Sequence, residues 1–185
     1  MQEIVASPAA VSPPPSQPPA PSPTPTAEPT GAEPAPKETG PELTFEQGQS
    51  VDKARSYLKF QAFSRSGLIN QLEFEGFSSE DATFAVDHLA PDWMSHAVKK
   101  AGSYLDYQAF SESGLVNQLE FEGFTAEEAR HGVANIEVDW MEQAAKKAKS
   151  YLELSAFSRS GLTDQLEFEG FTPEQSEHGA TSAGL

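Results

Sequence analysis

The sequence predicts an all-α protein made of three tandem three-helix repeats, similar to helix-turn-helix units, behind a disordered proline-rich N-terminal segment. The first observation is a fixed period: Tyr57, Tyr104 and Tyr151 are 47 residues apart, and so are Trp93 and Trp140. The second is a break in composition, because 13 of the 15 prolines lie before residue 42 and all 18 aromatic residues lie after residue 44. A fixed period of this size is typical of arrays of small supersecondary units.

The three copies are closely similar in their central part. Residues 57–77, 104–124 and 151–171 carry the same residue in all three copies at 15 of 21 positions. Each copy is long enough for only a modest core. We therefore divide the chain into four parts: a spacer at residues 1–43, and repeats at residues 44–90, 91–137 and 138–185.

The spacer contains nothing large to bury, so it cannot offset the entropy cost of ordering. We expect it to be disordered and partly in the polyproline-II conformation. If extended, it would reach on the order of 100 Å, at about 3 Å per residue. We interpret it as a tether that holds the repeats away from a membrane or a cell wall; the alternative is a dispensable tail.

The first helix of each repeat is expected to begin at a capping residue. In repeat 2, Asp92 is a good N-cap before a run of apolar residues at helical spacing. In repeat 3, Asp139 and Glu142 match the pattern of a capping box, and Thr44 and Gln47 match it in repeat 1.

The second helix of each repeat follows a short serine-containing motif and ends at a glycine. In repeat 1, Ser64 can cap the helix, and Leu68 and Leu72 lie one turn apart on one face. Gly76 suits the left-handed residue that follows a helix, because it has no Cβ. Phe77 would then contact Leu72 in a Schellman motif. The equivalent N-caps are Ser111 and Ser158.

The third helix is expected to begin immediately after this turn. Ser78 and Asp81 match a capping box, as do Thr125 with Glu128 and Thr172 with Gln175. The sequence therefore predicts a sharp helix–turn–helix in every repeat. Structural roles are assigned to Tyr57, Phe63, Gly67, Leu68, Leu72, Gly76, Phe77, Trp93, Tyr104, Phe110, Gly114, Leu115, Leu119, Gly123, Phe124, Trp140, Tyr151, Phe157, Gly161, Leu162, Leu166, Gly170 and Phe171.

One aromatic residue in each repeat has no place in this core. Phe74, Phe121 and Phe168 lie about 140° around the helix from the leucines. We expect these side chains to pack between repeats, against Trp93 or Trp140. The alternative is that they are exposed for a partner.

The residue types needed for catalysis or metal binding are absent or scattered. The chain has no cysteine, and its four histidines, His88, His96, His131 and His178, occupy non-equivalent positions in the repeats. None of them lies in a metal-binding or catalytic motif. The sequence predicts a non-enzymatic protein without a cofactor or metal.

The chain also carries a large excess of acidic over basic residues. The net charge is −16, which disfavours a nucleic-acid partner. We interpret the acidic residues first as a solvated surface. The alternative is a binding face, because such a field would steer a basic protein partner. Carboxylates two positions apart on a helix point about 200° apart, so they do not converge on one substrate. The candidate partner-binding residues are Glu73, Glu75, Glu120, Glu122, Glu167 and Glu169.

The repeated motif resembles a known family. The pattern A-x-x-Y-L-x-x-x-x-F-S-x-x-G-L-x-x-Q-L-x-x-E-G-F begins at Ala54 and recurs twice, 47 residues further on each time. It is similar to the Ltp family, the host cell surface-exposed lipoproteins with tandem helix-turn-helix-like domains. The resemblance covers residues 44–185.

This resemblance implies superinfection exclusion. Prophage-encoded members are anchored outside the cytoplasmic membrane and stop the DNA of an incoming related phage from entering. The implied partner is the injection machinery, in particular the tape-measure protein. Residues 1–12 lack the basic and apolar regions of a secretory signal. We therefore expect contact with the membrane only through an anchor that is not present in this chain. We also expect the chain to be a monomer.

Other functions are also compatible with parts of the sequence. A general protein-binding module of the cell envelope, unrelated to phage, would show the same repeats. The run at residues 76–89 is similar to ubiquitin-associated domains, which also use a Gly-Phe turn. A DNA-binding helix-turn-helix would use residues such as Asn70 and Gln71, but the neighbouring glutamates would repel phosphate.

Overall fold

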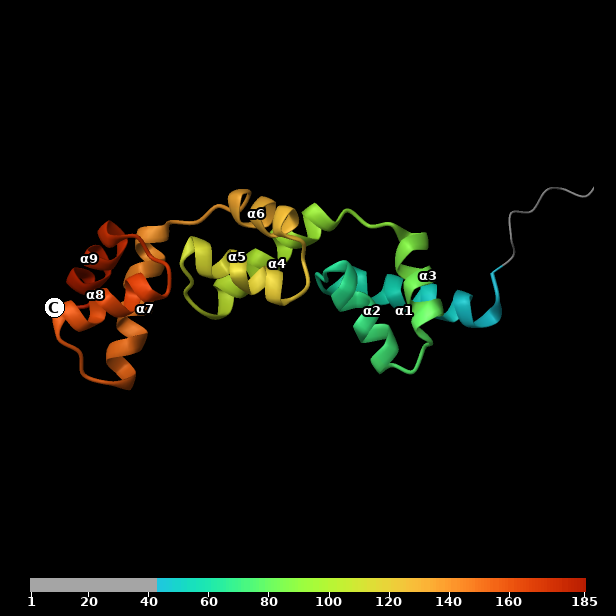
Figure 1. The fold of residues 1–185 in the computed structure, drawn as a ribbon, viewed down its shortest axis with the longest axis horizontal. Helices are drawn as coiled ribbons and strands as arrows, with labels where there is room; N and C mark the ends of the chain where they lie inside the picture. Colours follow the sequence, from blue (N-terminus) through green and yellow to red (C-terminus); the bar gives the residue numbers. More distant parts are fainter. Residues whose placement is uncertain (1–42) are drawn as a thin grey trace, which may run out of the picture. The chain divides into compact units, whose positions relative to one another are not determined.

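The computed structural model describes residues 43–185, and within them every regular element is a helix (Figure 1). The predicted all-α class is confirmed. Apart from Leu43, the predicted spacer at residues 1–43 lies outside the described residues. The helices are α1 (Phe45–Phe60), α2 (Arg65–Phe74), α3 (Ser79–Leu89), α4 (Trp93–Tyr107), α5 (Glu112–Phe121), α6 (Ala126–Ala134), α7 (Trp140–Leu154), α8 (Arg159–Phe168) and α9 (Pro173–Ser182).

Each repeat consists of three consecutive helices that enclose a core of their own. In repeat 2, the buried leucines of α5, Leu115 and Leu119, meet Ala97 and Ala101 of α4 and Val133 of α6. The small side chains on α4 let α6 approach closely. Repeats 1 and 3 have equivalent cores around the leucine pairs of α2 and α8.

The predicted N-caps are present. The Thr44 hydroxyl accepts from the backbone N–H of Gln47 at 3.1 Å, and the Gln47 side chain accepts from the N–H of Thr44. Asp92 caps α4 as expected.

Two predicted capping boxes are only half right. Asp139 caps α7, but the Glu142 carboxylate binds Lys146, one turn further on, at 2.9 Å. Ser78 caps α3, but the Asp81 carboxylate accepts from the Ser78 hydroxyl and leaves the backbone N–H of Ser78 without that bond.

The turn that ends the second helix and leads into the third has the predicted geometry. Gly76 has a φ of +97°, and the N–H of Phe77 donates to the carbonyl of Leu72 at 3.2 Å. This is the 6→1 bond of a Schellman motif. Gly123 and Gly170 repeat it with φ values of +88° and +91°. The turn brings the end of α2, α5 or α8 to the surface of its repeat.

Within residues 43–185, none of the helices has the length and apolar character required to cross a membrane.

Candidate functional site

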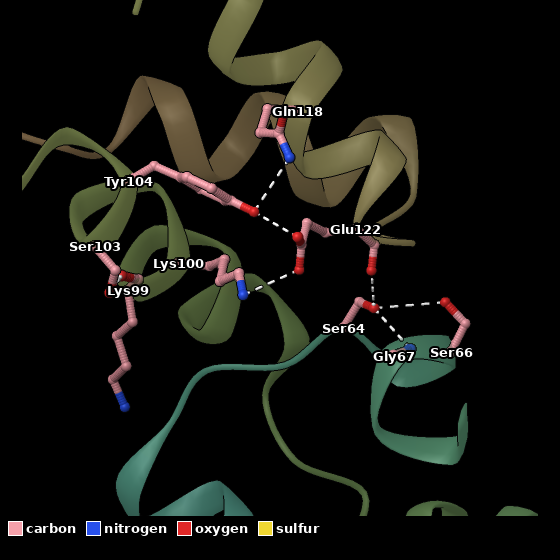
Figure 2. A network of polar contacts seen from close by, with 9 residues as sticks. All are labelled: Ser64, Ser66, Gly67, Lys99, Lys100, Ser103, Tyr104, Gln118 and Glu122. Carbon is pink, nitrogen blue, oxygen red and sulfur yellow. Dashed lines mark hydrogen bonds and ion pairs between the residues drawn. The ribbon is translucent and has the colours of Figure 1, made fainter. Parts of the chain in front are cut away.

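The first joint between repeats is made by serine hydroxyls at the start of α2. Ser64 caps α2 by accepting from the N–H of Gly67 at 2.9 Å, and it donates to the carbonyl of Glu122 at 2.6 Å. Figure 2 shows both of these Ser64 contacts. Ser66 donates to the carbonyl of Gly123 at 2.9 Å. The last carbonyls of a helix have no partner within it, so the joint satisfies those at the end of α5. It also sets the positive end of α2 against the negative end of α5.

The second joint repeats the first with the same chemistry. Ser111 donates to the carbonyl of Glu169 at 2.5 Å, and Ser113 donates to that of Gly170 at 3.1 Å. We call the serine pair at the start of the second helix the donor face. The two carbonyls at the end of the second helix in the following repeat are the acceptor face.

Two structural features require glycine at the acceptor face. The φ of this residue lies in the left-handed region, which L side chains rarely adopt. A Cβ added at Gly123 would also overlap the Oγ of Ser66, and one at Gly170 would overlap the Oγ of Ser113. At Gly76, which takes part in no joint between described repeats, an added Cβ would meet nothing within 4 Å.

A cleft lies beside each joint. The first, of about 580 Å³, is lined by residues 58–62 of repeat 1 and by residues of α4 that include His96, Lys99, Lys100 and Tyr104. The second, of about 640 Å³, is lined by the equivalent segments of repeats 2 and 3. Both clefts are features of the joints, with one wall from each repeat.

A lysine and a tyrosine bind the glutamate next to each turn, and a glutamine binds the tyrosine hydroxyl. In repeat 2, the Lys100 Nζ lies 3.0 Å from the Glu122 carboxylate, and the Tyr104 hydroxyl donates to the same carboxylate. The Gln118 amide donates to the Tyr104 oxygen at 3.2 Å (Figure 2). Equivalent contacts hold Glu75 through Lys53 and Tyr57, and link Glu169, Lys147 and Tyr151.

This network shifts the pKa values of Glu122, Tyr104 and Glu75. Burial raises the pKa of Glu122, but the hydrogen bonds from Tyr104 and Lys100 outweigh burial and hold that pKa below 4.5. Burial and the hydrogen bond to Glu122 raise the pKa of Tyr104 to about 12. The hydrogen bonds from Lys53 and Tyr57 lower the pKa of Glu75. The carboxylate of Glu122 therefore stays ionised within the joint.

The six glutamates predicted to bind a partner fall into two groups. Glu75, Glu122 and Glu169 are each engaged by a lysine and a tyrosine of their own repeat. Glu73, Glu120 and Glu167 are exposed at the end of the second helix. Unlike the first group, these three carboxylates are engaged by no lysine or tyrosine within residues 43–185, and their role in binding stays a prediction.

The expectation that Phe74, Phe121 and Phe168 pack between repeats is wrong. Their side chains are 87%, 86% and 87% exposed. The reason is the joint itself: neighbouring repeats meet through the termini of their second helices, so the far side of those helices remains uncovered. Trp93 and Trp140, the expected partners, pack against the cores of repeats 1 and 2.

The sequence interpretation missed a second set of exposed apolar residues. Phe60, Tyr107 and Leu154 occupy equivalent positions at the end of the first helix and are 81%, 90% and 84% exposed. Their period of 47 residues is visible in the sequence. It was missed because the residue type changes from copy to copy.

His96 is the histidine whose surroundings differ most from expectation. It is buried beside Trp93, and its Nδ1 has no hydrogen-bond partner within residues 43–185. Burial, followed by the charge of Lys99, lowers its pKa. In the described part of the chain, no group of acidic and histidine side chains has the arrangement of a metal site.

The fold and the exposed side chains define a tandem helical repeat protein with a recurring apolar and acidic surface. The family model of the host cell surface-exposed lipoprotein Ltp matches residues 46–89, 92–136 and 139–181. The chain belongs to this family.

One solved structure is similar to the chain: that of Ltp, a superinfection exclusion protein from the Streptococcus thermophilus temperate phage TP-J34. The identity is 32%, the TM-score is 0.49, and the match covers 52% of this chain and 100% of that one. No curated protein matches the chain significantly.

Proposed function

We propose that this chain is a non-enzymatic surface protein that excludes superinfecting phage, and that it acts at the outer side of the cytoplasmic membrane. Two findings support the proposal. The chain belongs to the family of host cell surface-exposed lipoproteins. Its sequence is also 32% identical to a superinfection exclusion protein over the whole of that protein's chain.

The single observation that carries the contact mechanism is the exposed phenylalanine at the end of each second helix. An aromatic side chain that is almost fully exposed contributes nothing to its own core and costs solubility. Here it occurs three times, and an exposed glutamate precedes it each time: Glu73 with Phe74, Glu120 with Phe121, and Glu167 with Phe168. Aromatic anchors beside polar groups are typical of protein-binding surfaces.

The partner in this proposal is a protein of the phage injection machinery, with the tape-measure protein as the first candidate. The phenylalanines bury against apolar residues of that partner, and the glutamates steer its basic segments by long-range attraction. Three equivalent contacts on one chain raise the overall affinity because the second and third become intramolecular. Binding would hold the machinery before the DNA passes the membrane.

The test uses cells that carry the full chain behind a lipoprotein signal, challenged with a panel of related phages. Phage adsorption and intracellular phage DNA are measured separately. Normal adsorption with little DNA inside supports a block at injection. Normal DNA entry with every phage overturns the proposal and favours an envelope protein-binding module unrelated to phage.

Two variants test whether the phenylalanines and the glutamates at the ends of the second helices form the contact surface. The triple substitution Phe74→Ser, Phe121→Ser and Phe168→Ser removes the apolar anchors, and Glu73→Lys, Glu120→Lys and Glu167→Lys reverses the adjacent charges. Both should restore DNA entry. The matched control replaces the other exposed set, with Phe60→Ser, Tyr107→Ser and Leu154→Ser, and should keep the block. Protection that survives both test variants would contradict this contact surface.

A further inference from the structure

The two joints leave one donor face and one acceptor face unused. Within residues 43–185, three repeats carry three copies of each face, and two joints occupy two of each. The remaining donor face is the pair Ser158 and Ser160 at the start of α8. The remaining acceptor face is formed by the carbonyls of Glu75 and Gly76 at the end of α2, which accept no hydrogen bond within residues 43–185.

The unused faces keep the geometry of the used ones. Ser158 accepts from the N–H of Gly161 at 3.1 Å, as Ser64 does from Gly67, so its hydroxyl is aimed in the same way. Gly76 has the same left-handed φ as Gly123. Each unused face is therefore already in the conformation that its counterparts adopt within a joint.

Residues at the unused faces are more exposed than their equivalents in the joints, where a neighbouring repeat covers them. Ser64 and Ser111 are 2% and 1% exposed, whereas Ser158 lies open. The side chain of Lys53 beside the unused acceptor face is 40% exposed, against 16% and 21% for the lysines beside the used ones. Phe77 is half-buried, whereas Phe124 is buried.

We infer that the unused faces pair between copies of this chain, so that repeat 3 of one copy binds repeat 1 of the next, head to tail. The occupant is a second copy because the chain itself shows twice that these two faces are complementary. The contact also sets the positive end of α8 against the negative end of α2 in the next copy. Such a contact joins two different surfaces, so it continues into longer chains unless the rotation between copies closes a ring.

Charge and connectivity set the strength of this association. Within one chain, the short connections between repeats keep the faces at high effective concentration. Between chains this help is lost, and two molecules of charge −16 repel each other. Added salt screens that repulsion, so we expect association at high protein concentration and more of it at high ionic strength.

The test is sedimentation of the full chain over a concentration series at low and high salt, with amide NMR on the same samples. The expected result is an average mass that rises with concentration beyond two copies, and more steeply at high salt. The amides of residues 75–77 and 158–161 should shift with it, while those of Ser64 and Ser111 stay still. A constant mass, or shifts confined to other surfaces, would overturn the inference.

A pair of variants gives the specific control. Ser160→Glu places a carboxylate on the donor face, opposite the region of Glu75, and a glutamate in the first turn of a helix does not harm folding. We expect it to weaken association about tenfold or more. Ser79→Glu adds the same charge in the first turn of α3 and should associate like the wild type. Equal association of the two variants would contradict the head-to-tail contact.

Discussion

Ser64 and Glu122 lie 58 positions apart in the sequence and are joined by a 2.6 Å hydrogen bond from the serine hydroxyl to the glutamate carbonyl. The same hydroxyl caps α2, so one atom both starts a helix and connects two repeats. The pair Ser111 and Glu169 does the same one repeat further on.

Replacing the joint serine should therefore cost more than replacing its unjoined counterpart. Ser64→Ala removes an N-cap, worth about 1 kcal/mol, and leaves the Glu122 carbonyl unpaired, worth about 1 kcal/mol more. Ser158→Ala removes only the cap. Because repeats can open separately, native-state hydrogen exchange in each repeat is the measurement. Equal losses in the two variants would show that the joint adds nothing.

Glycine substitutions test the packing of the same joint. Gly76→Ala and Gly123→Ala both force a side chain into the left-handed region, at about 1–2 kcal/mol each. Gly123→Ala should be the more damaging, because its Cβ displaces Ser66 and breaks that hydrogen bond. Amide NMR should show the shifts spreading to residues 64–67 in Gly123→Ala alone. Similar shifts there in Gly76→Ala would contradict this arrangement.

The stability of repeat 2 should depend on pH through Glu122. Because its pKa is held below 4.5 in the folded protein, its stabilising effect is present above that pH and is lost as the pH falls through the folded value. Glu122→Gln should therefore be less stable than the wild type at neutral pH, with the difference shrinking in acid. Urea unfolding at several pH values measures this.

The control for that experiment is Glu120→Gln, which removes the same charge from an exposed site two residues away. It should leave the pH dependence unchanged. If both variants gave the same profile, the effect would come from net charge, and the contacts with Lys100 and Tyr104 would not be its cause.

The same substitution at two phenylalanines three residues apart should change the stability by very different amounts. Phe121→Ser should alter the free energy of unfolding by less than about 0.5 kcal/mol, because that side chain lies in water. Phe124→Ser should cost roughly 3 kcal/mol or more, because Phe124 is buried in the core of repeat 2. Urea unfolding separates the two, and a large loss for Phe121→Ser would mean that it packs against the protein.

Most of the fold could be predicted because its determinants are local. The caps at Ser64 and Thr44 and the turn at Gly76 depend on neighbours within a few residues, and the structure confirms them. The exposure of Phe74 could not be predicted, because a helical wheel gives the direction of a side chain and says nothing of what covers it.

The joints were missed for a related reason. The partner of the Ser64 hydroxyl is a backbone carbonyl in the next repeat, and a carbonyl carries no residue identity. The network around Glu122 did have a signal: Lys100, Tyr104 and Glu122 each recur at the period of 47. The signal was overlooked because the glutamates were compared only with residues of the second helix. Their partners lie on the first helix of the same repeat.

The most direct test of the central claim is the amount of intracellular phage DNA in cells that carry the anchored chain, compared with cells that carry its triple Phe74→Ser, Phe121→Ser and Phe168→Ser variant. With equal adsorption, we predict little phage DNA inside the first cells and normal amounts inside the second. Normal DNA entry in both would contradict exclusion by this protein, and a block in both would contradict the phenylalanine surface.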